Sequence, residues 1–293
     1  MSARCSLCPR ACGADRVGGV GYCGVPDEIF VCRAAPHFGE EPCISGTRGS
    51  GAVFFAGCNL RCVYCQNHAI SRGRAGRAVT VERLREIFLA LQTRGVHNIN
   101  LVTPSHYSAQ IAAALSGVHL DIPVIWNSSG YETVAQLRAL EGLVQIYMPD
   151  CKYADGALAA AYSGAPDYPR VALAALREMY RQTGAFHMDA DDLLQRGVLI
   201  RHLILPGAPE NTLRVIDMVE DNFPADEVLF SLMSQYTPMP GLSRWPTLQR
   251  RVSREEFERC HAYLDFSALR YGYWQEPESA TGEMIPAFDC TGV

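Results

Sequence analysis

Residues 52–67 read AVFFAGCNLRCVYCQN, a short apolar run followed at once by three cysteines. The run AVFFAG (52–57) is continuous rather than alternating, as expected for a parallel strand buried on both faces. Cys58, Cys62 and Cys65 follow it in the pattern C-x3-C-x2-C. Because loops at the carboxyl ends of parallel strands converge and collect the chemistry of α/β folds, this stretch predicts a functional loop on a parallel sheet.

Five further apolar runs of the same character lie downstream, with amphipathic stretches between them. They are NINLVT (98–103), IPVIW (122–126), LVQIYM (143–148), VLIRHLIL (198–205) and EVLFSLM (227–233). Six short strands alternating with helices indicate βαβ units and a parallel sheet. Since six strands are too few for a closed eight-stranded barrel, we expect an α/β fold that is either a three-quarter barrel or an open doubly wound sheet.

The stretches between the runs carry helical signals. One apolar stripe with the spacing i, i+3, i+4, i+7 consists of Leu84, Ile87, Phe88 and Leu91. A similar pattern predicts a helix over 168–183, which Gly184 can end in a left-handed conformation. Ser253 and Glu256 have the spacing of a capping box and predict the start of a further helix.

Composition and charge narrow the function classes. The chain has 293 residues, of which 48% are hydrophobic, and a formal net charge of −5. This mild charge argues against a nucleic-acid binder with a broad basic face, and the Arg-rich stretch 72–77 is too short to change that. No apolar run approaches the ~20 residues of a membrane span, and MSARCSLC is no signal peptide. We therefore expect a cytoplasmic protein that binds neither nucleic acid nor membranes.

Cysteine is unusually frequent, with 12 in the chain and nine of them in the first 65 residues. In a reducing compartment, clustered cysteines are more often metal or cluster ligands than disulfides. The pattern C-x2-C-x3-C-x10-C is formed by Cys5, Cys8, Cys12 and Cys23. Four thiolates suit a closed zinc site or a second [4Fe–4S] cluster, and the spacing does not choose between them. Cys32 or Cys43 could replace one of the four, and three isolated cysteines are expected in the core: Cys151, Cys260 and Cys290.

The chain divides into three parts on these grounds. Residues 1–45 are rich in Cys, Gly and Pro without sustained periodicity, and we expect a small domain ordered by metal. Residues 46–270 carry the alternating strands and helices of the barrel. Residues 271–293 form an aromatic tail that could cover the barrel mouth or dock a partner.

The three cysteines after the first strand suit an iron–sulfur cluster with one reactive position. Three thiolates hold three irons of a cubane, and the fourth iron then lacks a protein ligand and can chelate a small molecule. A three-cysteine zinc site is the alternative, with His68 near enough to be a fourth ligand. Tyr64 could shield such a cluster or pack on an adenine ring.

At these residues the sequence resembles the radical S-adenosylmethionine (SAM) superfamily. GCNLRCVYCQN is similar to the branch of glycyl-radical-enzyme activases, which includes pyruvate formate-lyase activating enzyme. The leader CSLCPRACG…GYCG is similar to a group of activase-related proteins with a cysteine-rich N-terminal segment. The resemblance covers about residues 50 to 240.

The resemblance implies a partial (β/α)6 TIM-like barrel with a [4Fe–4S] cluster that binds SAM at its unique iron. One electron cleaves SAM, and the resulting 5′-deoxyadenosyl radical abstracts a hydrogen atom from a protein glycyl site or a small molecule. It also implies a flavodoxin- or ferredoxin-type electron donor.

The resemblance places the SAM contacts at strand ends. The second strand of the family ends in a Gly-Gly-Glu-like element, for which this chain has LVTPSHY. The strand ends WNSSGY, MPDCKY and LIRHLILPG supply the other positions. The candidate SAM-binding residues are Tyr64, Thr103, Ser105, Asn127, Ser128, Asp150, Lys152 and Arg201. Arg201 suits a bidentate grip on the SAM carboxylate, and its alternative role is to neutralise a core acid.

Other polar residues near strand ends have simpler explanations. His106 and His202 are more often satisfied hydrogen-bonding groups than acids or bases in such places, and Gln235 and Tyr236 fit rim positions. Two functions of other classes stay open: a non-catalytic iron–sulfur electron carrier and a zinc-organised binding module.

Overall fold

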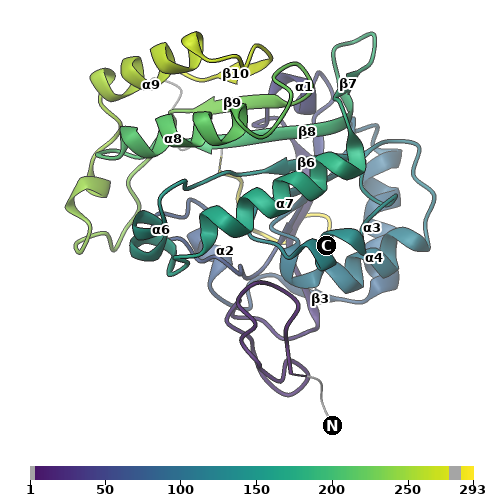
Figure 1. The fold of residues 1–293 in the computed structure, drawn as a ribbon. Helices are drawn as coiled ribbons and strands as arrows, with labels where there is room; N and C mark the ends of the chain where they lie inside the picture. The colour runs from purple at the N-terminus through teal and green to yellow at the C-terminus, as the bar shows by residue number, and fades with distance from the viewer. Residues whose placement is uncertain (1–3, 277–284) are drawn as a thin grey trace.

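The computed structural model describes residues 4–276 and 285–293, and a ten-stranded sheet lies at its centre (Figure 1). The strands are β1 (Ile29–His37), β2 (Ser50–Phe55), β3 (Arg77–Val79), β4 (Ile99–Val102), β5 (Val124–Ser128), β6 (Ile146–Pro149), β7 (His187–Met188), β8 (Leu194–Leu203), β9 (Leu229–Met233) and β10 (Gly272–Trp274). The α-helices are α1 (Pro42–Ser45), α2 (His68–Ser71), α3 (Val81–Thr93), α4 (Ser108–Ser116), α5 (Val134–Arg138), α6 (Gly156–Ser163), α7 (Tyr168–Thr183), α8 (Pro209–Glu220) and α9 (Arg254–Phe266). Two short 3₁₀ helices are η1 (Ser105–Tyr107) and η2 (Pro246–Gln249).

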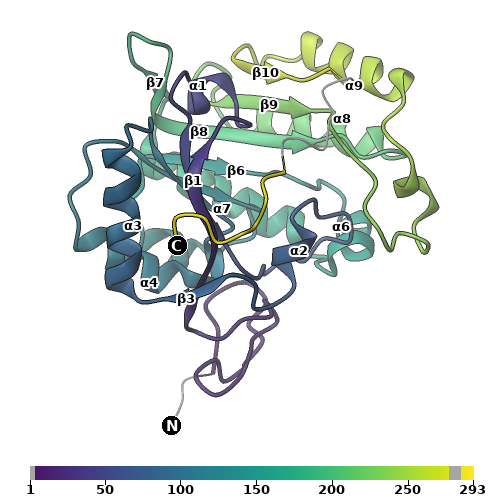
Figure 2. The same cartoon turned by 180° about the vertical axis from the view of Figure 1, so that it is seen from behind.

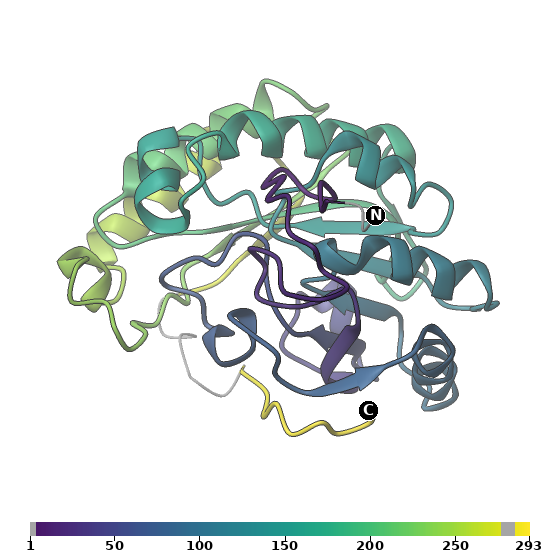
Figure 3. The same cartoon turned by 90° about the horizontal axis from the view of Figure 1, so that it is seen from below.

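The six predicted parallel strands are confirmed, with bounds that differ by a few residues. β2, β4, β5, β6, β8 and β9 pair in this order, each parallel to the next. A strand order that follows the sequence without reversal places successive crossovers on one face of the sheet. Seen from below, the helices accordingly form an arc around the outside of the sheet (Figure 3). The fold is therefore a partial (β/α)6 barrel rather than a doubly wound sheet.

The predicted helical patterns also match the structure. All four residues of the stripe on α3 are buried, so this helix packs against the sheet as its spacing predicts. α7 covers Tyr168–Thr183, and Gly184 follows it at φ 67°. The capping box of α9 is present in both directions between Ser253 and Glu256.

Four strands of the sheet were not predicted: β1, β3, β10 and the short β7, which pairs with β8. β1 runs antiparallel to β2 and to β3, and β10 adds a further parallel strand beside β9. The structure therefore places Ile29–His37 in the main sheet, although the 1–45 segment shows no periodicity, and Gly272–Trp274 in the same sheet rather than in a free tail. β1 contains Pro36 and lies at the antiparallel side of the sheet, where a missing N–H is tolerated.

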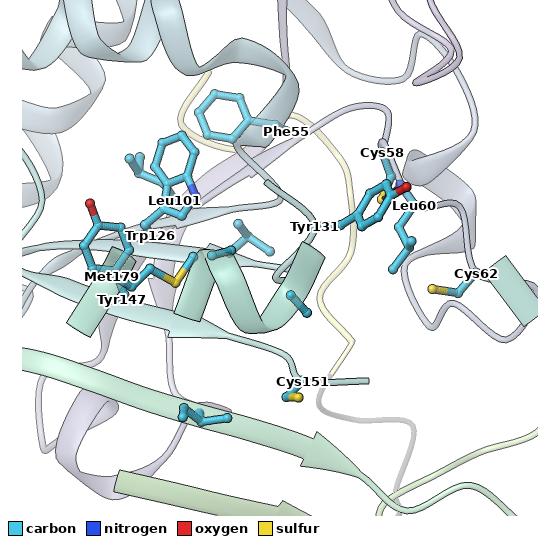
Figure 4. Close-up of a cluster of buried hydrophobic side chains, with 14 of the residues drawn as sticks. Phe55, Cys58, Leu60, Cys62, Leu101, Trp126, Tyr131, Tyr147, Cys151 and Met179 are labelled. Carbon is cyan, nitrogen blue, oxygen red and sulfur yellow. Dashed lines mark hydrogen bonds between the residues drawn. The ribbon is translucent and has the colours of Figure 1, made fainter. Parts of the chain in front are cut away.

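The core fills the space between the strands and the helices, and it reaches the cysteine loop. Trp126 and Tyr147 are fully buried in its interior (Figure 4). At one side of the same view, Tyr131 lies next to Cys58 and Leu60. The functional loop is thus anchored directly on the core.

The first described residues, 4–28, contain no helix or strand and form a lobe of loops at one end of the molecule (Figures 1 and 2). We call these residues the N-terminal lobe. Among the described helices, none combines the length and the apolar character that crossing a membrane requires.

Candidate active site

The cysteine loop, residues 58–65, follows β2 and is shaped by two residues with positive φ. Gly57 has φ 82°, and a Cβ there would lie 2.8 Å from the carbonyl oxygen of Cys23. Only glycine allows this close approach. Arg61, at φ 58°, turns the chain again between Cys58 and Cys62. The loop therefore folds back on itself and brings its cysteines to one region.

The three thiols of the loop affect one another. Burial and, to a lesser extent, the neighbouring thiols of Cys62 and Cys65 raise the pKa of Cys58 to about 12. Burial and Cys62 also raise the pKa of Cys65. Buried thiolates that repel each other are a donor set that a cationic iron or zinc centre would neutralise, so the residues fit a metal cluster. Within 4–276 and 285–293, no three His, Cys, Asp or Glu side chains are already grouped closely enough to hold a metal ion.

A cavity of about 200 Å³ opens beside the loop at the carboxyl ends of the strands. Its wall contains ten of the candidate site residues: Cys58, Cys62, Cys65, Tyr64, Thr103, Asn127, Ser128, Asp150, Lys152 and Arg201. Gln235 and Tyr236 also line it. The cavity therefore brings together residues that lie as far apart in the sequence as Cys58 and Tyr236.

Three charged residues of the cavity form one ionic network. Lys152 Nζ lies 2.6 Å from a carboxylate oxygen of Asp150, and Arg201 Nε donates to the other at 3.2 Å. Burial alone would raise the pKa of Asp150, but Lys152 and Arg201 together lower it below its usual range. Burial disfavours the charge of Lys152, while Asp150 and the thiols of Cys62 and Cys65 raise its pKa. A carboxylate and two cations are thus held charged beside the thiol loop.

Glu40 completes this network and was missed from the sequence. Its carboxylate lies 2.9 Å from Arg201 Nη1 and accepts hydrogen bonds from the side-chain amides of Asn100 and Asn127 at 2.9 and 3.2 Å. Arg201 Nη2 also donates to Asn127 at 2.8 Å. Glu40 lies in the loop between β1 and α1, so only the unpredicted course of β1 places it in the barrel. The acidic pair Glu40–Glu41 before Pro42 is the signal that could have found it.

Thr103 and Tyr64 occupy defined places in the cavity wall. Thr103 has φ 60°, which is rare for a β-branched residue, and its N–H donates to the carbonyl of Asn127 at 2.9 Å. Tyr64 is buried among the edges of Tyr153, Tyr162 and Tyr236. These packed rings exclude water from one side of the loop.

Ser105, a predicted SAM contact, does not line the cavity. It lies in η1 and is buried, and its hydroxyl donates to Glu132. The short helix turns the side chain away from the strand end. His106 is buried, with Nε2 2.7 Å from the carbonyl of Ala56 and Nδ1 without a hydrogen-bond partner among the described residues, and burial lowers its pKa to about 3.

His202 is a core residue whose two ring nitrogens both have hydrogen-bond partners. It is fully buried, with Nδ1 2.6 Å from the carbonyl of Cys151 and Nε2 3.0 Å from the hydroxyl of Thr212. Burial lowers its pKa to about 4, so it is neutral at physiological pH.

Glu132 should make the stability of the protein depend on pH. Burial raises its pKa to about 7, against 4.5 for a free side chain. Its proton stabilises the folded state fully below pH 4.5, and this contribution is lost as the pH rises through about 7. At ~1.4 kcal/mol per pH unit, we expect the free energy of unfolding of the wild type to fall by about 3 kcal/mol relative to Glu132→Gln between pH 4.5 and 7.

Denaturant unfolding at pH 5 and pH 8 checks this expectation. Glu86→Gln, which changes an exposed side chain on α3, is the control and should follow the wild type. Parallel pH profiles of the wild type and Glu132→Gln would contradict it.

The N-terminal cysteines lie near one another in the N-terminal lobe. Burial raises the pKa of Cys8, and Cys5, Cys23 and Cys12 each raise it further. Cys8 and Cys23 are buried, Cys5 is partly exposed and Cys12 is exposed. Cys32 and Cys43, the possible replacements for one of the four ligands, lie outside the N-terminal lobe. Cys32 is in β1, and Cys43 belongs to a separate cluster of buried apolar residues.

We predict that these four cysteines hold a metal centre separate from the one on the cysteine loop. Metal analysis for iron and zinc should find an excess in the wild type that a Cys5→Ser/Cys8→Ser double variant lacks, because two of four ligands are removed. The same measurement identifies the metal. Equal metal content in both proteins would mean that the lobe is only a thiol-rich cap.

The remaining predicted core cysteines behave differently from one another. Cys151 and Cys260 are fully buried, as predicted. Cys290 is not isolated: its N–H donates to the carbonyl of Cys32 at 2.9 Å, and it is only partly buried. Residues 285–293 run along β1 at this point (Figure 2). Part of the predicted cover of the barrel mouth, 277–284, lies outside the described residues, while Ile285 and Pro286 line the cavity.

Comparison with known proteins finds one matching family and a few similar chains. Residues 52–149 match the family described as Radical SAM superfamily. A protein of Methanocaldococcus jannaschii named "Uncharacterized protein MJ0674" is 26% identical over 265 residues, which cover 87% of this chain and 72% of that protein.

Among solved structures, the chain is similar to SuiB of Streptococcus suis. With SuiB bound to its precursor peptide SuiA, the TM-score is 0.54 at 15% identity, over 78% of this chain and 49% of SuiB. With SuiB alone, the TM-score is 0.50 at 13% identity, over 75% and 47%. The chain spans about half the length of the SuiB chains, and at this identity the similarity is one of fold. On the match of residues 52–149, the chain contains a radical SAM superfamily domain, and that family implies SAM cleavage with a [4Fe–4S] cluster.

Proposed function

We propose that the protein is a radical SAM enzyme of the glycyl-radical-activase-like branch. The observation that carries the proposal is the loop of three thiols, two of them buried and that of Cys65 partly exposed, which opens on a cavity lined by Asp150, Lys152 and Arg201. A [4Fe–4S] cluster on Cys58, Cys62 and Cys65 would pass one electron to SAM, breaking its sulfur–C5′ bond to give methionine and a 5′-deoxyadenosyl radical that takes a hydrogen atom from the substrate. The activase-like branch is supported by GCNLRCVYCQN and by the Asp-x-Lys of Asp150 and Lys152.

The chain's own residues would bind and orient SAM. The carboxylate of Asp150 and the backbone carbonyls near Thr103 are acceptors for an ammonium group, and Lys152 and Arg201 are cations for a carboxylate. The packed tyrosines around Tyr64 would exclude water from the loop side of the cavity. Arg201 is already paired with two acids, so a bound carboxylate would have to displace Glu40 or Asp150 from it.

The substrate is either a protein glycyl site or a small molecule. Ile285 and Pro286 in the cavity wall support a mouth narrowed by the C-terminal segment, which favours the small molecule. The electron donor would be a flavodoxin- or ferredoxin-type protein.

Anaerobic reconstitution with iron and sulfide, followed by dithionite and SAM, tests the proposal. We expect a brown protein that forms 5′-deoxyadenosine. An iron–sulfur electron carrier would be brown and form none, and a zinc-organised binding module would be colourless. Transfer of deuterium from a labelled compound into 5′-deoxyadenosine then identifies the substrate.

A further inference from the structure

Arg10 joins the N-terminal lobe to the cysteine loop through four backbone carbonyls. Its Nε donates to the carbonyl of Asn59 at 2.8 Å, and Nη2 donates to that of Leu60 at 3.2 Å. On its other side the guanidinium donates to the carbonyls of Ser163, at 2.7 Å, and Gly164. One side chain thus connects the lobe, the cysteine loop and the end of α6.

The end of α6 is itself part of the environment of the cysteine loop. The hydroxyl of Ser163 donates to the sulfur of Cys62 at 3.1 Å, and the N–H of Val63 donates to the carbonyl of Tyr162 at 2.9 Å. The last carbonyls of a helix lack partners within the helix and carry a partial negative charge, so a guanidinium binds them well. By holding these carbonyls and those of the loop together, Arg10 fixes the loop against the helix.

The guanidinium is also held in position. It lies 4.1 Å from the ring centre of Tyr22 and 5.2 Å from that of Tyr131. Two aromatic faces favour a planar cation between them and restrict its orientation. Tyr131 lies beside Cys58 and Leu60 in the structure (Figure 4).

The backbone beside Arg10 contacts the first part of the lobe's cysteine pattern. The N–H of Ala11, the next residue, donates to the carbonyl of Cys8 at 2.9 Å, and Cys12 follows directly. Two further contacts link the same regions: the N–H of Cys58 donates to the carbonyl of Cys23 at 3.1 Å, and Arg61 donates to that of Tyr22 at 3.0 Å.

We propose that Arg10 is a positioning residue that transmits the order of the N-terminal cysteine site to the cysteine loop, so that the lobe controls how firmly the loop is held for its cluster. The inference rests on the proposed function in one respect, namely that the loop holds a cluster. Ordering of the lobe by its thiol ligands fixes the backbone of Arg10, and the side chain then fixes the carbonyls of Asn59, Leu60, Ser163 and Gly164.

Hydrogen exchange of the full-length protein, as purified under anaerobic conditions, tests the positioning role without relying on activity. In Arg10→Gln we expect amides of residues 58–65 and 160–164 to exchange at least tenfold faster than in the wild type. Arg10→Lys keeps the charge but not the planar fork, and should raise exchange by a smaller factor. Arg83→Gln removes an exposed arginine of α3 and should leave these segments unchanged. Wild-type exchange rates in both Arg10 variants would overturn the proposal.

Coupling to the lobe is tested by the Cys5→Ser/Cys8→Ser variant, alone and combined with Arg10→Gln. We expect the same segments to exchange faster in the cysteine variant, with no further increase in the combination, because both changes break one connection. Effects that multiply would show that the lobe and Arg10 act separately. The rate at which each variant releases cluster iron to a chelator should rank in the same order as its hydrogen-exchange rate. A wild type that assembles no cluster would end the proposed function, while the exchange results would still decide the role of Arg10.

Discussion

Replacing any one of Cys58, Cys62 and Cys65 by Ala should reduce SAM cleavage to the background rate and remove most of the iron of that cluster. In the proposed cluster each thiolate would be the ligand of one iron, and the loop offers no other cysteine as a replacement. Burial and the neighbouring thiols raise the pKa of Cys58 and of Cys65, so the three residues form one site whose members cannot be exchanged singly. Iron and sulfide analysis, visible absorption and 5′-deoxyadenosine formation measure the effect.

Cys260→Ala is the matched control, since Cys260 is a fully buried thiol on α9 outside the cavity. It should keep both cluster and cleavage. If all three loop variants still cleave SAM, the assignment of the cluster to Cys58, Cys62 and Cys65 is wrong.

Much of the barrel was predictable because its strands are buried on both faces. Such strands need unbroken apolar, β-branched runs, and those runs stand out from the amphipathic helices around them. The strands that flank the six parallel ones carry no such signal: β1 and β10 are stabilised by pairing with β2 and β9. Pairing of this kind depends on the whole fold and not on a local pattern.

Part of the candidate site was also predictable from the sequence. Asp150, Lys152 and Arg201 meet in one cavity because the carboxyl ends of parallel strands converge. Glu40 could not be predicted, since it reaches the cavity from a loop beyond an unpredicted strand. Ser105, a candidate SAM contact, does not line the cavity, because a 3₁₀ turn that the sequence of the strand end does not reveal follows the strand.

Arg201 is the residue for which geometry changes the expected result. From the sequence, its first expected role is to grip the SAM carboxylate. In the structure its guanidinium lies 2.9 Å from Glu40 and 3.2 Å from Asp150, and Glu41 is 4.0 Å away. The Arg201 side chain is only 12% exposed and that of Glu41 3%, so these charges lie away from water. The pKa of Glu41 is raised, because burial raises it by more than Arg201 lowers it.

Arg201→Ala should therefore destabilise the fold before it affects ligand binding. Removing one partner of a buried ionic network leaves uncompensated charge and costs about 3–5 kcal/mol. For a chain of this size we expect the thermal midpoint to fall by roughly 10 °C. Arg83→Ala, which breaks an exposed pair on α3, should cost no more than ~1 kcal/mol.

A companion variant separates the two roles of Arg201. Adding Glu40→Gln to Arg201→Ala removes one of the unpaired carboxylates and should recover part of the lost stability, whereas a pure SAM-binding role gives no such coupling. SAM affinity, measured on the folded fraction of each variant, supplies the second readout. Loss of a charge-assisted hydrogen bond worth about 1.5–3 kcal/mol would weaken binding roughly 10- to 150-fold. Such a loss with an unchanged midpoint would show that Arg201 binds SAM and is not needed to neutralise the acids around it.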